Sequence, residues 1–170
     1  WRAAGVPGTV HGLALAHQKY GSKPWAELLA PAIKLAKGFP VTYSVSKSLQ
    51  NSDLLAKFPE SRRIFQRNGK FYEPDELLVQ PELGRTLERI AKHGPRDFYE
   101  GETAKKFAAE MAANGGLITL EDLKNYRTAE RKPLTGAYRG YDIITAPPPS
   151  SGGLGILHIM GILESSGYTA

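Results

Sequence analysis

Proline and glycine divide the first two-thirds of the chain into short segments, and this spacing limits what the chain can fold into. Proline is favoured where a helix begins and glycine where a helix ends. Between these breaks, apolar residues recur at three- and four-residue intervals, which is typical of amphipathic helices. The clearest segment is Pro81–His93, which Gly94 closes. Its apolar side consists of Leu83, Leu87, Ile90 and Ala91.

The same signals predict several other helices. Thr9 is expected to cap a helix that runs to about Tyr20, with Gly21 as its stop. Pro31 interrupts the pattern of Trp25–Lys37, which predicts a kink or two short helices. The remaining expected helices are a weaker one within Thr42–Phe58, one over Glu102–Asn114, and a short one started by a capping box of Thr119 and Asp122.

The periodicity changes near the end of the chain. Leu134–Thr145 combines β-branched and aromatic residues with turn glycines, which predicts two strands, and Asn68-Gly69 predicts a small hairpin. Leu154–Leu163 is apolar nearly all round, which predicts a helix buried on most sides. We therefore expect a mainly α chain with a small β element (α+β), forming one segment over residues 1–170. A helical region over 1–130 precedes a strand pair, a PPPSSGG turn and the buried helix over 131–170.

Composition removes several classes of function. The chain has no cysteine, so disulfides, thiolate metal sites and cysteine nucleophiles are excluded. The net charge is +5, but the basic residues are spread along the chain with acids close by, which disfavours a nucleic-acid-binding surface. No apolar run is long enough to span a bilayer. The chain begins at Trp1 without an initiator Met, which suggests a piece of a longer protein.

No metal site or cofactor is expected. The four histidines, His11, His17, His93 and His158, lack an H-E-x-x-H pattern, and carboxylates do not cluster with them. The glycines after Ser151 match neither G-x-G-x-x-G nor the P-loop ending. Close packing of the backbone explains these glycines better than a phosphate cradle.

The segment APPPSSGG, residues 146–153, is the strongest local candidate for a site. Ser150 or Ser151 could act as a nucleophile on a turn between a strand and a helix. The nucleophile-elbow pattern G-x-S-x-G fails, however, because prolines stand where its first glycine should be. The alternative is that one of the two serines caps the following helix.

Six collinear segments together form a family pattern. They are GVPGTVHGL (5–13), PAIKLAKGFPV (31–41), QPELGRTLERIAKHGPRDFYEG (80–101), NGGLITLEDLKNY (114–126), RKPLTGAYRGY (131–141) and PPPSSGG (147–153). In this order they resemble the interior of the large subunit of the γ-glutamyltranspeptidase (γ-glutamyltransferase) family, and they cover nearly the whole chain.

The resemblance implies an N-terminal-nucleophile hydrolase with an αββα fold, made as a precursor that cuts itself into large and small subunits. In this family, the N-terminal threonine of the small subunit attacks the γ-glutamyl amide of substrates such as glutathione. Water, an amino acid or a peptide then accepts the γ-glutamyl group. Other substrates, such as cephalosporin side chains, occur among relatives. The family implies a periplasmic or extracellular location.

The resemblance transfers no catalytic role to this chain. The family's threonine, its substrate-binding arginine and its oxyanion-hole serines belong to other segments. The only Thr-x-His here, Thr9-Val10-His11, lacks the neighbours of the family's cleavage junction. Ser150 and Ser151 remain residues that could approach the assembled substrate pocket.

The implied partners are the small subunit, the rest of the large subunit and a small γ-glutamyl substrate. The isolated segment is expected to be inactive and to self-associate through the apolar face of Leu154–Leu163. The main alternative is a helical interaction module with no chemistry of its own. A basic nucleic-acid binder is a weaker third hypothesis.

Overall fold

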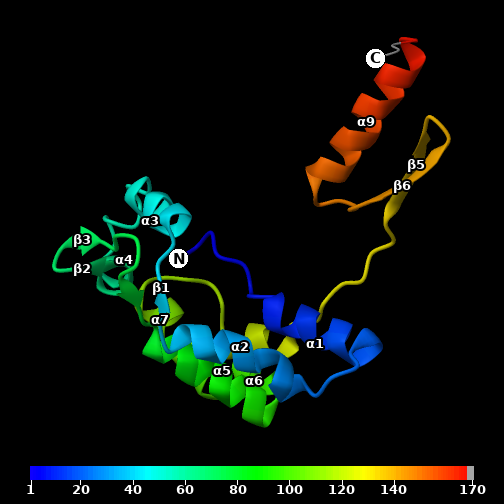
Figure 1. The fold of residues 1–170 in the computed structure, drawn as a ribbon. Coiled ribbons are helices and arrows are strands. Elements are labelled where there is room, and N and C mark those ends of the chain that lie inside the picture. Colours follow the sequence, from blue (N-terminus) through cyan, green and yellow to red (C-terminus); the bar gives the residue numbers. More distant parts are fainter. Residues whose placement is uncertain (168–170) are drawn as a thin grey trace. The chain divides into compact units, whose positions relative to one another are not determined.

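The computed structural model describes residues 1–167. Its internal contacts divide the chain into two compact units, Trp1–Thr128 and Ala129–Ala170. The described chain is mainly helical with small two-stranded sheets, as expected from the sequence (Figure 1). That residues 1–170 form a single segment of a larger subunit stays a prediction. No helix in residues 1–167 has both the length and the apolar character needed to cross a membrane.

The first unit contains eight helices and two small strand pairs within its described residues. Its helices are α1 Thr9–Tyr20, α2 Trp25–Ala36, α3 Tyr43–Gln50, α4 Pro59–Phe65, α5 Pro81–His93, α6 Arg96–Glu100, α7 Glu102–Ala113 and α8 Leu120–Asn125. Its antiparallel pairs are β1 Phe39–Pro40 with β4 Leu77–Leu78, and β2 Gln66–Arg67 with β3 Lys70–Phe71.

Three predictions for this unit are confirmed by its turns and caps. The helix α5 ends at His93, and Gly94 follows with a φ of 83°. The hairpin between β2 and β3 turns at Asn68 and Gly69, both with positive φ. The helix α8 begins with the predicted capping box, in which Thr119 Oγ1 accepts a hydrogen bond from the Asp122 N–H. The Asp122 carboxylate accepts one from the Thr119 N–H in return, at 2.8 Å.

The N-terminus of α1 differs from the prediction. Thr9 is the first helical residue, and Gly8 occupies the cap position without a side chain to bond there. A Cβ on Gly8 would lie 2.2 Å from the hydroxyl oxygen of Tyr126. The expected Thr9 cap is therefore wrong, because the close approach of a tyrosine from the far end of the unit selects glycine at the cap.

The helix α2 runs through Pro31 as one helix, so of the two expected outcomes the division into two short helices is wrong, and the kink stays a prediction. It packs along α5, and Gly84 of α5 is buried against Ala36 near the end of α2. The predicted helix within Thr42–Phe58 covers only α3, which Thr42 caps.

A buried apolar cluster of the first unit lies between its helices α6, α7 and α8. Its buried residues are Tyr99, Ala104, Met111, Ile118 and Leu123. Val10 of α1 packs against this cluster, and so does Tyr126, which follows α8. The first and last parts of the unit therefore share one core.

The second unit contains the predicted strand pair, β5 Leu134–Tyr138 and β6 Tyr141–Thr145, which is antiparallel. Arg139 and Gly140 form its two-residue turn, both with positive φ. The helix α9, Ser151–Ser165, follows the proline-rich segment. This helix packs closely on β5, because a Cβ on Gly136 of β5 would lie 2.7 Å from Leu157 Cδ2 of α9.

The prediction that Leu154–Leu163 is buried on most sides is wrong for this chain. Gly153 is the only buried residue of α9, and Ile159 and Ile162 are 60% and 66% exposed. The reason is geometric, because a hairpin of two strands can cover only one side of a helix.

The capping box of α8 predicts a pH-dependent contribution to stability. The hydrogen bond from the Thr119 hydroxyl, and then that from its N–H, hold the pKa of Asp122 below its ordinary value of 3.8. This contribution is present above the unfolded pKa and is lost as the pH falls through the lower folded value. We expect Asp122→Asn to lower the urea midpoint at pH 7, and the difference from wild type to shrink below pH 3.8.

The matched control is Glu121→Gln, which removes the same charge from the same helical turn outside the capping box. A pH-independent effect of Asp122→Asn, or an equal effect of Glu121→Gln, would contradict the prediction.

Candidate functional site

The segment from Ala146 to Ser150 leaves β6 and enters α9. The Ser150 N–H donates a hydrogen bond to the Pro147 carbonyl at 3.2 Å, which closes a turn. Ser150 is the cap residue of α9, and Ser151 is its first helical residue. Both serines are exposed. The Ser150 hydroxyl makes no cap hydrogen bond, so the expected capping is correct in position and wrong in its interaction.

Gly153 shows why glycine is needed after the serines. It is buried, and a Cβ there would lie 2.1 Å from the Ala146 carbonyl oxygen and 2.8 Å from Thr145 Oγ1. The expected close packing of the backbone is confirmed at this position. Gly155 differs, because nothing lies within 4 Å of the place a Cβ would take. The approach of α9 to the end of β6 therefore depends on one glycine.

The Thr9-Val10-His11 motif takes part in an aromatic cluster of the first unit. The Nδ1 atom of His11 lies 2.8 Å from Thr128 Oγ1. The main-chain N–H of His11 donates to the Tyr99 hydroxyl at 3.0 Å. That hydroxyl donates in turn to the Pro7 carbonyl at 2.8 Å. Burial raises the pKa of Tyr99, although the hydrogen bond from His11 opposes this effect. These contacts fix α1 to the end of the unit.

The His11–Thr128 contact joins an imidazole to a hydroxyl, as a base and a nucleophile would be joined. The Thr128 N–H also donates toward the same Nδ1 atom, at 3.4 Å. The neighbours of the imidazole are the rings of Tyr99 and Tyr126, and no carboxylate among residues 1–167 bonds to it. Without such an orienting group, the pair is best explained as a tertiary contact.

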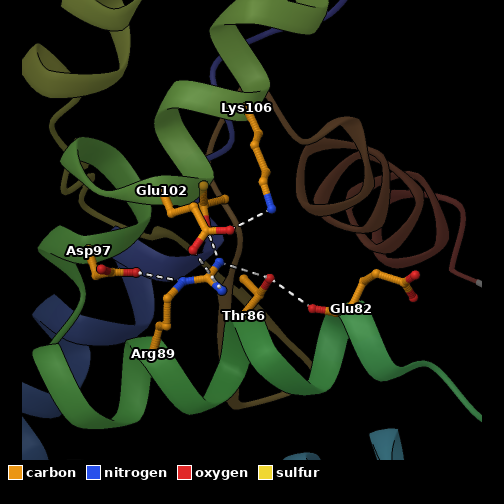
Figure 2. Close-up of polar contacts among 7 residues, drawn as sticks. Glu82, Thr86, Arg89, Asp97, Glu102 and Lys106 are labelled. Carbon is orange, nitrogen blue, oxygen red and sulfur yellow. Dashed lines mark hydrogen bonds and ion pairs between the residues drawn. The ribbon is translucent and has the colours of Figure 1, made fainter.

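Arg89 forms the most connected polar cluster of the first unit (Figure 2). Its Nε atom lies 3.5 Å from Asp97 Oδ2 on α6, and its Nη1 atom lies 3.6 Å from Glu102 Oε2 on α7. Its Nη2 atom donates to Thr86 Oγ1 at 3.3 Å and to Thr103 Oγ1 at 2.9 Å. One guanidinium therefore links three consecutive helices.

The electrostatics of this cluster are those of a structural ion-pair network. Arg89 Nε and Asp97 Oδ2 are buried and have no hydrogen bond, so their ion pair is their main compensation. The hydrogen bond from Lys106, and then the charge of Arg89, lower the pKa of Glu102. Each acid has a cationic partner, which leaves no free acid or base for proton transfer.

Sequence reasoning missed both clusters. Arg89 lies on the polar side of the predicted helix, where an exposed cation is the usual expectation. The available signal was the pair of acids, Asp97 and Glu102, in the first turns of the two following helices. Within residues 1–167, no three histidine, aspartate or glutamate side chains are placed to hold a metal ion.

Replacing Arg89 tests its role. We expect Arg89→Ala to destabilise the first unit by about 1–3 kcal/mol, because Asp97 would stay buried without a partner. Arg89→Lys should recover only part of this, since a lysine cannot reach several acceptors with one planar group. Urea unfolding followed by Trp25 fluorescence measures the effect, because Trp25 Nε1 donates to the Ile90 carbonyl on α5.

Arg85→Ala is the matched control, because Arg85 is an exposed arginine one turn earlier on the same helix. Equal midpoints for the two alanine variants would rule out a specific role for Arg89.

Comparison with known proteins identifies the family. The sequence profile described as gamma-glutamyltranspeptidase matches residues 1–170. The chain is 45% identical over 166 residues to the glutathione hydrolase proenzyme of Escherichia coli, covering 96% of this chain and 29% of that protein. It is 42% identical over 165 residues to the acylase ACY 1 proenzyme of Pseudomonas sp. (strain SE83), covering 96% of this chain and 30% of that protein.

A solved structure agrees. The crystal structure of Helicobacter pylori gamma-glutamyltranspeptidase matches with a TM-score of 0.90 and 39% identity, covering 100% of this chain and 51% of that chain. By contrast, the chain spans less than a third of the length of the two proenzymes named above, from E. coli and Pseudomonas sp.. The six motif segments, the whole-length profile match and the shared backbone agree, and the chain belongs to the gamma-glutamyltranspeptidase family.

Proposed function

We propose that the protein containing this chain cleaves γ-glutamyl amides such as glutathione and transfers the γ-glutamyl group to water, an amino acid or a peptide. The observation that carries this proposal is the match of the family profile to the entire chain. The E. coli relative, named a glutathione hydrolase, supports the same chemistry. Within the protein that contains it, this chain is an interior segment of the large subunit.

In the proposed reaction, the nucleophile comes from outside this chain. The N-terminal threonine of the small subunit attacks the γ-glutamyl carbonyl, with its own α-amino group as the base. An oxyanion hole stabilises the tetrahedral intermediate. The amine leaves, and water or an acceptor amine then attacks the acyl-enzyme. This chain contributes architecture, and Ser150 and Ser151 lie at the edge of the assembled substrate pocket.

The exposed apolar side of α9 supports the assignment to a larger assembly. Its members are Leu154, Ile156, Ile159 and Ile162, all of them exposed. Monomeric proteins seldom leave so many large apolar side chains of one helix in water. We propose that the small subunit and the rest of the large subunit cover it, and that β5 and β6 join the central sheet of an αββα fold. The family resemblance also favours a periplasmic or extracellular location.

A second substrate class is supported by one relative, which is named an acylase. The whole parent enzyme, assayed on γ-glutamyl-p-nitroanilide and on a cephalosporin side-chain amide, would distinguish the two classes. Release of p-nitroaniline that disappears when the candidate threonine is changed to alanine supports γ-glutamyl transfer. Hydrolysis of the cephalosporin amide alone would favour the acylase. Activity on neither would favour a non-catalytic helical module.

Substitution of the two serines tests their role in the parent enzyme. We expect Ser150→Ala and Ser151→Ala to leave kcat within about threefold of wild type, because neither hydroxyl is assigned to the reacting atoms. Turnover of γ-glutamyl-p-nitroanilide measures this, and thermal unfolding confirms that each variant is folded. A folded variant without turnover would show that a serine is catalytic.

The apolar side of α9 predicts self-association of the 170-residue chain by itself. We expect its mass by light scattering to rise above that of a monomer with concentration, because the exposed isoleucines can be buried between copies. The double variant Ile159→Glu/Ile162→Glu should remain monomeric. Leu54→Glu, at an exposed leucine of the first unit, is the control. A wild-type monomer at high concentration would refute the prediction.

A further inference from the structure

A cavity of about 460 Å³ lies within the first unit. Its lining comes from α1, from the start of α2, from the α5–α6 junction with α6, and from α8 with the residues after it. We call it the α1–α8 cavity. Its size lies within the range typical of small-molecule sites. The residues that define its chemistry are Trp25, Arg96, Tyr99, Lys124, Tyr126 and Arg127.

Aromatic rings form one part of the α1–α8 cavity. The rings of Tyr99 and Tyr126 are stacked, with an interplanar angle of 6° and a centroid distance of 5.8 Å. The rings of His17 and Trp25 are 5.3 Å apart. The polar atoms of Tyr99 and Trp25 are bonded within the protein, to the Pro7 and Ile90 carbonyls. Tyr99 is 5% exposed, so the ring surface that the cavity offers a ligand belongs mainly to the half-buried Trp25 and Tyr126.

Cations form the other part of the cavity. Three basic side chains line it, and no aspartate or glutamate is among its lining residues. Arg96 is paired with Glu100. Lys124 makes no ion pair with the residues that the structure describes. The Arg127 guanidinium donates to the main-chain carbonyls of Lys124 and Tyr126, at 2.9 and 2.7 Å. Two cations in the cavity thus lack a carboxylate partner within residues 1–167.

We propose that the α1–α8 cavity binds a small aromatic carboxylate of one or two rings. The ring is packed among the aromatic residues, and the carboxylate is paired with Lys124 and Arg127. A neutral aromatic compound would leave these cations unused, and a ringless anion would leave the aromatic surface in water.

The test uses the whole 170-residue chain and 1-naphthoate as the probe. Calorimetry compares 1-naphthoate with its neutral analogue 1-naphthamide and with acetate, which has no ring. We expect naphthoate to bind and each comparison compound to bind at least about fivefold more weakly, with naphthoate affinity falling as salt rises. Equal affinity for naphthoate and naphthamide, or no binding of naphthoate at millimolar concentration, would overturn the proposal.

Trp25 reports where the probe binds. The chain has two tryptophans, Trp1 and Trp25, so Trp1→Phe leaves one indole N–H signal in a nitrogen–proton NMR spectrum. We expect naphthoate to shift this signal along the same binding curve that calorimetry gives. An unshifted Trp25 signal at saturation would show that the probe binds elsewhere and would overturn the proposal.

Charge removal tests the two cations. Exposed ion pairs each contribute modestly, so Lys124→Gln/Arg127→Gln should weaken naphthoate binding by about tenfold and remove most of its salt dependence. Lys70→Gln, at an exposed lysine on the β2–β3 hairpin, should have no effect. If the double variant does not fold, Lys124→Gln alone should still weaken binding by about threefold. Unchanged affinity in a folded variant would contradict the assignment.

Discussion

The buried hydroxyl of Tyr99 is the contact on which the first unit most depends. It joins the backbone before α1 and the first turn of α1 to α6, across about ninety positions of sequence. Its ring stacks on Tyr126, whose hydroxyl in turn lies close to Gly8, where a Cβ would collide with it. A buried tyrosine needs a partner for its polar atom, and here that requirement brings the two ends of the unit together. The α1–α8 cavity is a consequence of the same arrangement.

Arg89 performs a similar task with charge. The helices α5, α6 and α7 follow one another with few residues between them, so their polar ends lie close together. A single guanidinium reaches the acids and threonines that these ends present (Figure 2). Removing these charges from water costs free energy when the network forms. Breaking the formed network would leave a buried charge unpaired, which costs more and favours one arrangement of the three helices over others. Its groups are engaged with one another, so the cluster positions structure and performs no chemistry.

In the second unit, packing is confined to one side of the helix α9. The hairpin and α9 pack against each other through Gly136, Leu157 and Gly153, where glycine permits close approach. The opposite side of α9 stays apolar and exposed. That combination is understandable in a chain that spans 29% of its E. coli relative, since the remaining residues of such a protein can supply the missing cover. The PPPSSGG segment is accordingly a connection whose glycine is essential to packing.

The sequence by itself determined the helices whose ends carry strong local signals, such as α5 and the capping box of α8, as well as both predicted hairpins and the family. These features depend on residues only a few positions apart, and local chemistry is visible in sequence. Tertiary structure alone decided that Gly8 and not Thr9 caps α1, that α2 continues through Pro31, and that α9 is largely exposed. It also placed Arg89 among its partners and Lys124 beside the aromatic rings. Each of these outcomes depends on residues distant in sequence, because packing and long-range hydrogen bonds outweigh local preference wherever the two compete.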